Sequence, residues 1–131
     1  QDGEVLTWDI RMKRPNCGAY LSPACAHTLE HLFATFARNS AWSKNVVYVG
    51  PMGCLTGFYL LTTGLSPAEA LALVQTCFRQ MAAYTGVIPG ASASECGNYL
   101  MMDPIAARAE AAAMLPVLDA LDQDHLTYPA P

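Results

Sequence analysis

The chain has 131 residues, of which 53% are hydrophobic and only 14% charged, with a formal net charge of −4. This length fits one domain with a real core, and the acidic balance without any basic run argues against binding to nucleic acid or to an anionic membrane. An apolar composition of this kind favours burial of surface against a second copy of the chain, and we therefore expect a homodimer. Because a basic surface is lacking, we expect a small molecule as the other partner.

The first half of the chain predicts a strand followed by a helix. Residues 4–13 alternate between apolar and polar side chains, which is typical of a half-buried strand. Ser22 and Pro23 then have the form of a helix N-cap followed by proline in the first turn. We expect this helix to run to about Asn39.

The next segment, residues 45–68, carries no charge and is long enough to raise the question of a membrane span. Several glycines and a proline interrupt it, however, and threonines lie among its apolar residues. Two short strands, residues 45–49 and 55–63, explain this pattern better than one spanning helix. We therefore expect no membrane partner.

Two further helices are expected in the second half. Ser66 begins a capping box, so a helix should run from there to about Tyr84, and Asp103 caps a last helix that Pro116 should kink or end. Residues 91–101 indicate a loop or a weak strand. The fold class predicted is α+β, with helices packed on a mainly antiparallel sheet and a loosely held tail after residue 121.

The chain contains five cysteines without CxxC spacing, and its first residues show neither a basic start nor an apolar run of the kind found in signal peptides. We expect a reduced, cytoplasmic protein. Because free cysteine is among the most buried residue types, each thiol is core filler unless its surroundings argue otherwise.

The segment "HTLEHL" places two histidines, His27 and His31, four residues apart, with Glu30 directly before the second. On a helix these three share a face opposite the apolar stripe. Histidines at this spacing can direct both rings at one divalent metal, and a neighbouring glutamate can reach a group bound to that metal. A solvated helix face is the alternative.

Two histidines need a third ligand. The candidates are a carboxylate or one of the remaining histidine and cysteine side chains: Cys17, Cys25, Cys54, Cys77, Cys96 and His125. Cys96 is the strongest of these, because the loop "SECGNY" is polar and offers no reason for an apolar filler. Cys54 lies between two glycines, where a ligand can approach closely, and suits an acid-base thiol.

Four segments, "WDIRMKRPN", "HTLEHL", "PMGCLTGFY" and "ECGNY", resemble the S-ribosylhomocysteine lyase family, which makes the precursor of the bacterial quorum-sensing signal autoinducer-2. The resemblance covers residues 1–131 as one domain. An HxxEH motif alone also suits inverzincin metallopeptidases, but these use an acidic third ligand and lack the other segments.

The resemblance implies a set of residue roles. His27, His31 and Cys96 match the ligands of a metal that is Fe²⁺ in the family, with Zn²⁺ or Co²⁺ as substitutes, and Glu30 and Cys54 match the two acid-base residues. Arg11 matches a substrate contact. The resemblance further implies an obligate homodimer with active sites at the subunit interface, and cleavage of S-ribosylhomocysteine to homocysteine and 4,5-dihydroxy-2,3-pentanedione.

The chain also departs from the family pattern. Tyr48 takes the place of a sugar-binding aspartate, Gly50 the place of a serine, and Leu55 the place of a polar residue. The family's first strand, with a serine and a histidine that line the substrate site, is not found before Gln1. These departures leave open a second hypothesis, a metal-binding homologue of impaired catalysis that binds a ligand or a partner.

Overall fold

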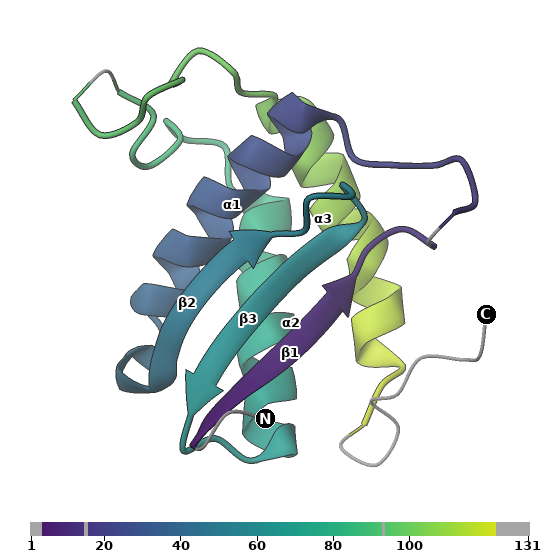
Figure 1. Cartoon of the computed structure of the whole chain (residues 1–131), viewed down its shortest axis with the longest axis vertical. Coiled ribbons are helices and arrows are strands. Elements are labelled where there is room, and N and C mark those ends of the chain that lie inside the picture. Colours follow the sequence, from purple (N-terminus) through teal and green to yellow (C-terminus); the bar gives the residue numbers. More distant parts are fainter. Residues whose placement is uncertain (1–3, 15, 93, 123–131) are drawn as a thin grey trace.

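One antiparallel sheet, backed by helices on one face, makes up the protein (Figure 1). The structure is a computed structural model that describes residues 4–14, 16–92 and 94–122. Its helices and strands confirm the predicted α+β class. In chain order they are β1 (Val5–Arg11), α1 (Pro23–Arg38), the short 3-10 helix η1 (Ser43–Asn45), β2 (Val46–Pro51), β3 (Gly57–Thr63), α2 (Pro67–Ala83) and α3 (Pro104–Asp119).

The three strands lie in the order β1-β3-β2, so that β3 is central. Trp8 pairs with Leu60 across β1 and β3, and Arg11 pairs with Gly57 at the end of the ladder. A Cβ atom at Gly57 would lie 1.9 Å from the carbonyl oxygen of Ile10, so any other residue would push the two strands apart. This close approach fixes the end of β1 beside the loop that leads into β3.

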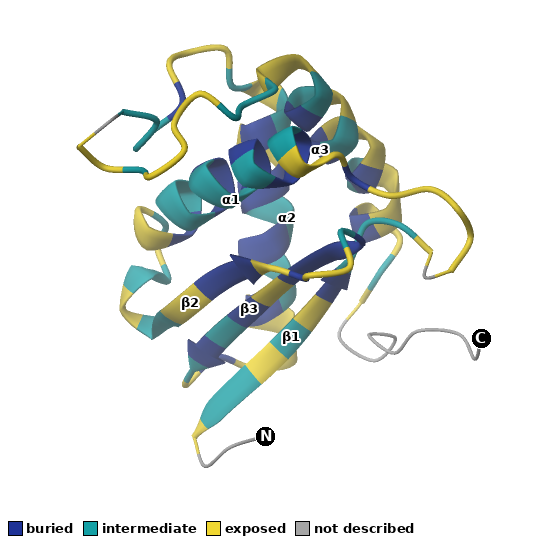
Figure 2. Cartoon of the chain, turned by 45° about the horizontal axis from the view of Figure 1, so that its top comes forward, coloured by how far each residue is buried: buried dark blue, intermediate teal, exposed yellow. Residues whose placement is uncertain are grey.

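The core lies between the sheet and the helices (Figure 2). Three fully buried phenylalanines join the layers: Phe33 of α1 meets Phe58 of β3 and Phe78 of α2 edge to face, with ring centroids 6.1 and 5.4 Å apart. Such contacts bury large apolar area in a defined geometry. They hold α1 rigidly over the sheet.

The opposite face of the sheet has no helix over it among the described residues (Figure 1). The strand register places Tyr59 and Leu61 on this uncovered face, together with Tyr48 of β2. Tyr48 is 48% exposed and Tyr59 39%. Apolar and aromatic side chains at this exposure are typical of a surface that another chain covers.

The helices begin where their capping residues predict. Ser22 Oγ accepts a hydrogen bond from the Cys25 amide, and Ser66 and Glu69 form both bonds of a capping box. Asp103 accepts from the Ala106 amide at the start of α3. Each cap satisfies amides that the helix itself cannot, and so fixes the first turn.

The structure corrects two expectations. Strand β3 begins at Gly57, two residues late, because Leu55 has a positive φ of 62° that a strand cannot accommodate. Of the two effects expected of Pro116, a kink or an end of the last helix, the end is wrong, since α3 continues to Asp119. Pro116 lies in the final turn, where a proline removes few hydrogen bonds, and its carbonyl still accepts from the Ala120 amide.

Other expectations have simpler outcomes. The described residues between 91 and 101 form turns and no strand, and the uncharged window 45–68 forms β2, β3 and their connections. No helix in the described ranges is long and apolar enough to cross a bilayer. The proposed loose tail and His125 lie outside the described residues, apart from Asp122.

Candidate metal centre and acid-base residues

Two successive turns of α1 carry the two histidines. His27 Nε2 lies 3.1 Å from His31 Nε2, and the rings meet edge to face. Leu29 and Phe33, on the other side of the helix, are fully buried. The prediction that the histidines share a face opposite the core is therefore confirmed.

Backbone carbonyls hold both imidazoles by their other nitrogen. His27 Nδ1 lies 2.8 Å from the Met101 oxygen, and His31 Nδ1 lies 2.8 Å from the Pro89 oxygen. A carbonyl only accepts, so each Nδ1 must carry the proton and donate it. The two Nε2 atoms of neutral rings then face each other with lone pairs, an arrangement that a cation between them would stabilise.

Cys96 completes a group of three donors. Its Sγ lies 3.3 Å from His27 Nε2, and all three ligand atoms lie within 4.8 Å of one another. Tetrahedral coordination of a Zn²⁺-sized ion places two nitrogens about 3.3 Å apart and a nitrogen and a sulfur about 3.6 Å apart. The His27–His31 and His27–Cys96 distances therefore fit a divalent metal, and three donors of a tetrahedral site would leave one position for water or substrate.

Gly90 allows the loop to pass close to His31. Its φ is +73°, and a Cβ atom there would lie 3.0 Å from His31 Nδ1. A side chain would thus be strained and would press on the ring that the neighbouring Pro89 carbonyl orients. The glycine thus lets the backbone carbonyl of Pro89 approach and orient the His31 ring.

Glu30 lines a cleft of about 650 Å³ between α1, β2 and the loop 89–97. The three candidate ligands, His27, His31 and Cys96, here called the metal group, line the same cleft. Tyr48 and Glu95 also line this cleft. The structure thus brings Glu30 together with the predicted ligands, on the same helix face. A carboxylate at this place can exchange protons with a molecule bound in the cleft.

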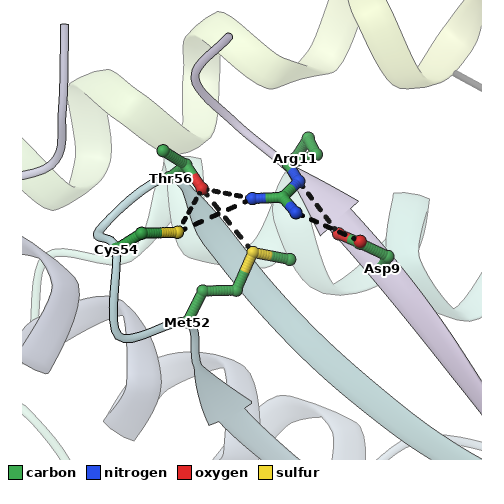
Figure 3. Close-up of polar contacts among 5 residues, drawn as sticks. All are labelled: Asp9, Arg11, Met52, Cys54 and Thr56. Carbon is green, nitrogen blue, oxygen red and sulfur yellow. Dashed lines mark hydrogen bonds and ion pairs between the residues drawn. The ribbon is translucent and has the colours of Figure 1, made fainter. Parts of the chain in front are cut away.

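Cys54 lies apart from that cleft, and neither it nor Arg11 is among the described residues that line it. Its Sγ lies 2.9 Å from Thr56 Oγ1 and 3.7 Å from Arg11 Nη1 (Figure 3). Arg11 in turn pairs with Asp9, at 3.3 Å between Nε and Oδ1. Within one chain, the predicted site residues therefore form two groups, a metal group and a thiol group.

The sequence model of the S-ribosylhomocysteinase (LuxS) family matches residues 1–124. The chain belongs to this family. S-ribosylhomocysteine lyase from Desulfotalea psychrophila is 45% identical over 96% of this chain and 81% of its own length. S-ribosylhomocysteine lyase from Phocaeicola vulgatus is 48% identical over 95% of this chain and 80% of its own length. The enzyme of the same name from Clostridium acetobutylicum is 40% identical over 98% of this chain and 82% of its own length.

Among the cysteines of this LuxS-family chain, the structure separates a thiol of lowered pKa from two core residues. Cys25 and Cys77 are buried, which confirms both as core residues, and burial raises the pKa of Cys25 to about 11 and that of Cys77 to about 12. The pKa of Cys54 is lowered, first by the hydrogen bond from the Thr56 hydroxyl and then by Arg11. Cys17 is exposed, and all five cysteines are free thiols.

Thr56, which contacts the candidate thiol, is the site neighbour that the sequence motifs do not single out. The sequence predicts a strand over residues 55–63, in which the Thr56 side chain would be one of several alternating positions. Only the turn around Leu55, whose φ is 62°, returns the Thr56 hydroxyl to the sulfur. The signal available was weak: a hydroxyl residue next to a candidate thiol.

Two of the departures from the family pattern are in contact with each other. A Cβ atom at Gly50 would lie 2.2 Å from the Tyr48 hydroxyl oxygen, so the Tyr48 side chain lies over the glycine. The absence of a side chain at Gly50 provides the room for the ring. Tyr48 and Gly50 therefore form one local contact at the edge of the cleft.

Proposed function

We propose that the chain is a metal-dependent S-ribosylhomocysteine lyase, which cleaves the thioether of its substrate to give homocysteine and 4,5-dihydroxy-2,3-pentanedione, the precursor of autoinducer-2. The observation that carries the proposal is the facing pair of histidine lone pairs beside Cys96. It is supported by membership of the family and by relatives of that name. A role in quorum sensing would follow from the product.

His27, His31 and Cys96 would hold the metal, which we propose to be Fe²⁺, with Zn²⁺ or Co²⁺ as substitutes. A two-nitrogen, one-sulfur donor set accepts all three ions. A divalent ion held there would act as a Lewis acid that stabilises negative charge on a substrate oxygen. The carbonyls of Met101 and Pro89 orient the two rings for this task.

Cys54 and Glu30 would move the protons. Moving the sugar carbonyl from C1 to C2 requires a proton to leave C2 and one to arrive at C1, and the next move repeats this between C3 and C2. Loss of the C4 proton then expels homocysteine from C5 by β-elimination. Cys54, as a thiolate, suits the early abstraction of a proton from the sugar, and Glu30 suits the later proton transfers. Arg11 would contact the substrate.

A second copy of the chain would bring the two groups together. Arg11 lies on the uncovered face of the sheet with Tyr59 and Leu61, whereas Glu30 lines the cleft on α1. We propose a homodimer packed through this face, with each active site built from Cys54 of one copy and the metal group of the other. The exposure of Tyr48 and Tyr59 supports this arrangement.

Mixing two inactive variants tests the shared site. A dimer of one Cys54→Ala subunit and one Glu30→Gln subunit would contain one intact site and one doubly impaired site. Statistical co-refolding should then recover about one quarter of the wild-type activity, because half the dimers are mixed and each has one good site. No recovery would place both residues of a site in the same subunit.

Thiol release tests the reaction itself. Protein purified without oxygen and loaded with Fe²⁺ or Co²⁺ should release homocysteine from S-ribosylhomocysteine, and Cys54→Ala should abolish the release. Protein that binds one metal per chain but releases no thiol would reject the lyase and favour the impaired homologue.

Absorption spectroscopy tests the ligands independently of activity. The Co²⁺ protein should show a thiolate-to-metal charge-transfer band, which Cys96→Ser should remove while Cys17→Ser retains it. A band that persists in Cys96→Ser would exclude that sulfur as a ligand.

We also propose that the protein works in the cytoplasm. Five free thiols, one of them with a lowered pKa, suit a reducing compartment. Localisation of the tagged full-length protein in cell fractions tests this.

A further inference from the structure

Thr56 is a buried polar residue held directly against the candidate acid-base thiol. It is only 1% exposed, and its carbonyl oxygen accepts hydrogen bonds from the amides of Met12 and Lys13, at 2.8 and 2.9 Å. The end of β1 thus fixes the backbone that carries this hydroxyl. A side chain so placed cannot turn to solvent, so its hydrogen bonds must be made with its neighbours.

Three neighbours surround the hydroxyl (Figure 3). Arg11 Nη1 donates to Thr56 Oγ1, and two sulfur atoms lie within reach of its single proton: Cys54 Sγ at 2.9 Å and Met52 Sδ at 3.7 Å. Because a guanidinium only donates, the hydroxyl proton must point away from Arg11. It therefore points to one sulfur or the other.

We propose that Thr56 is a positioning residue for Cys54: its hydroxyl donates to the Cys54 sulfur when this is a thiolate and turns to Met52 when Cys54 carries the proton. In the protonated state the Cys54 S–H donates to the free lone pair of Thr56 Oγ1. Rotation about one C–O bond exchanges the two states, and no heavy atom has to move. The thiolate is thus given a donor each time it releases its proton.

The Thr56 hydroxyl is a closer donor to the Cys54 sulfur than the charged groups around it. Arg11, from β1, is farther from the sulfur than Thr56, at 3.7 against 2.9 Å, and shares its charge with Asp9 through contacts of 3.3 and 3.4 Å. From β3, Tyr59 pairs with Asp9 across the register, and Gly57 pairs with Arg11. The hydroxyl's hydrogen bond to the thiolate is one to a charged acceptor and so stabilises the anion more than a bond between neutral groups would.

Alkylation of Cys54 by iodoacetamide as a function of pH tests the proposal, with the modified peptide identified by mass spectrometry in metal-loaded protein. Thr56→Val keeps the shape and removes the hydroxyl. It should raise the pH at which Cys54 becomes reactive and slow alkylation at neutral pH about tenfold, the size expected of one hydrogen bond to a charged group. Thr56→Ser should restore the wild-type profile.

Thr62→Val is the matched control. Thr62 is also fully buried, lies on β3, the strand that follows Thr56, and accepts a hydrogen bond from Trp8 Nε1 at 2.8 Å. The Thr62→Val substitution should lower the stability of the fold without changing how the rate of Cys54 alkylation depends on pH. A profile unchanged in Thr56→Val, or shifted equally by Thr62→Val, would overturn the proposal, as would failure of Thr56→Ser to restore it.

The catalytic consequence rests on the proposed lyase function, whereas the alkylation result does not. In the lyase assay, Thr56→Val should lower kcat and kcat/KM together and move the acid limb of the pH profile to higher pH, with KM unchanged. A rise in KM with an unmoved pH profile would mean that Thr56 only shapes the substrate site, and would also overturn the proposal.

Discussion

The metal group and the thiol group are positioned by different means. His27 and His31 lie one turn apart on a single helix, and main-chain carbonyls orient both rings. Cys54, in contrast, depends on side chains from the end of β1 and the loop before β3. Backbone support tolerates change in the surrounding side chains, whereas side-chain support makes the state of the thiol sensitive to single substitutions.

The largest expected effect breaks the metal group at a ligand. His31→Ala should reduce bound metal to a small fraction of one ion per chain and abolish thiol release, because two donors cannot close the site. Elemental analysis after dialysis against a chelator measures this. Cys17→Ser, at an exposed thiol outside the group, should retain full metal content. A metal-replete His31→Ala protein would contradict the assigned ligands.

Gly90→Ala tests the claim that backbone orients the ligand. The substituted residue would be strained by about 1–2 kcal/mol at φ +73°, and its Cβ would press on His31 Nδ1 from 3.0 Å. Displacement of the Pro89 carbonyl should weaken metal binding about 10- to 100-fold. Competition with a chromogenic chelator gives the affinity.

Gly18→Ala is the control for that strain. Gly18 has a similar φ of +81°, but a Cβ atom there would meet nothing within 4 Å. This variant should lose a similar amount of folding stability and keep its metal affinity. Equal weakening in both variants would attribute the effect to general destabilisation rather than to the histidine support.

The contrast among the thiols predicts an order of modification. In the native metal-loaded protein at neutral pH, iodoacetamide should alkylate Cys54 well before Cys25 or Cys77, whose buried thiols have a pKa of about 11 and about 12. Because a raised pKa keeps a thiol protonated, those two should react only after denaturation. Peptide mapping over time measures the order, and early labelling of Cys25 would refute the packing assigned to it.

The same contrast explains what could be predicted from the sequence. Helix starts follow from local capping residues such as Ser22 and Ser66, and ligands four residues apart on a helix share a face whatever the rest of the chain does. The metal group was therefore predictable. The Thr56 contact depends on the positive φ of Leu55 and on the alignment of β1 with β3, which no local pattern encodes.

The smallest effect concerns Tyr48 and Gly50. In Gly50→Ala the new methyl group would lie 2.2 Å from the Tyr48 hydroxyl oxygen, so the ring must move from its place at the edge of the cleft. Tyr48 is 48% exposed and its ring is the end of a flexible side chain, so stability should change by less than about 0.5 kcal/mol. KM should change by a few-fold, because the ring borders the space that a substrate would occupy.

A double-mutant cycle separates the ring from the glycine. If Gly50 acts only by leaving room for Tyr48, then adding Gly50→Ala to Tyr48→Ala should have no further effect on KM, and the two single effects should not add. Additive effects would show that the Gly50 backbone contributes on its own. In either case the cycle measures how far this pair adjusts the cleft without involving the metal group or the thiol group.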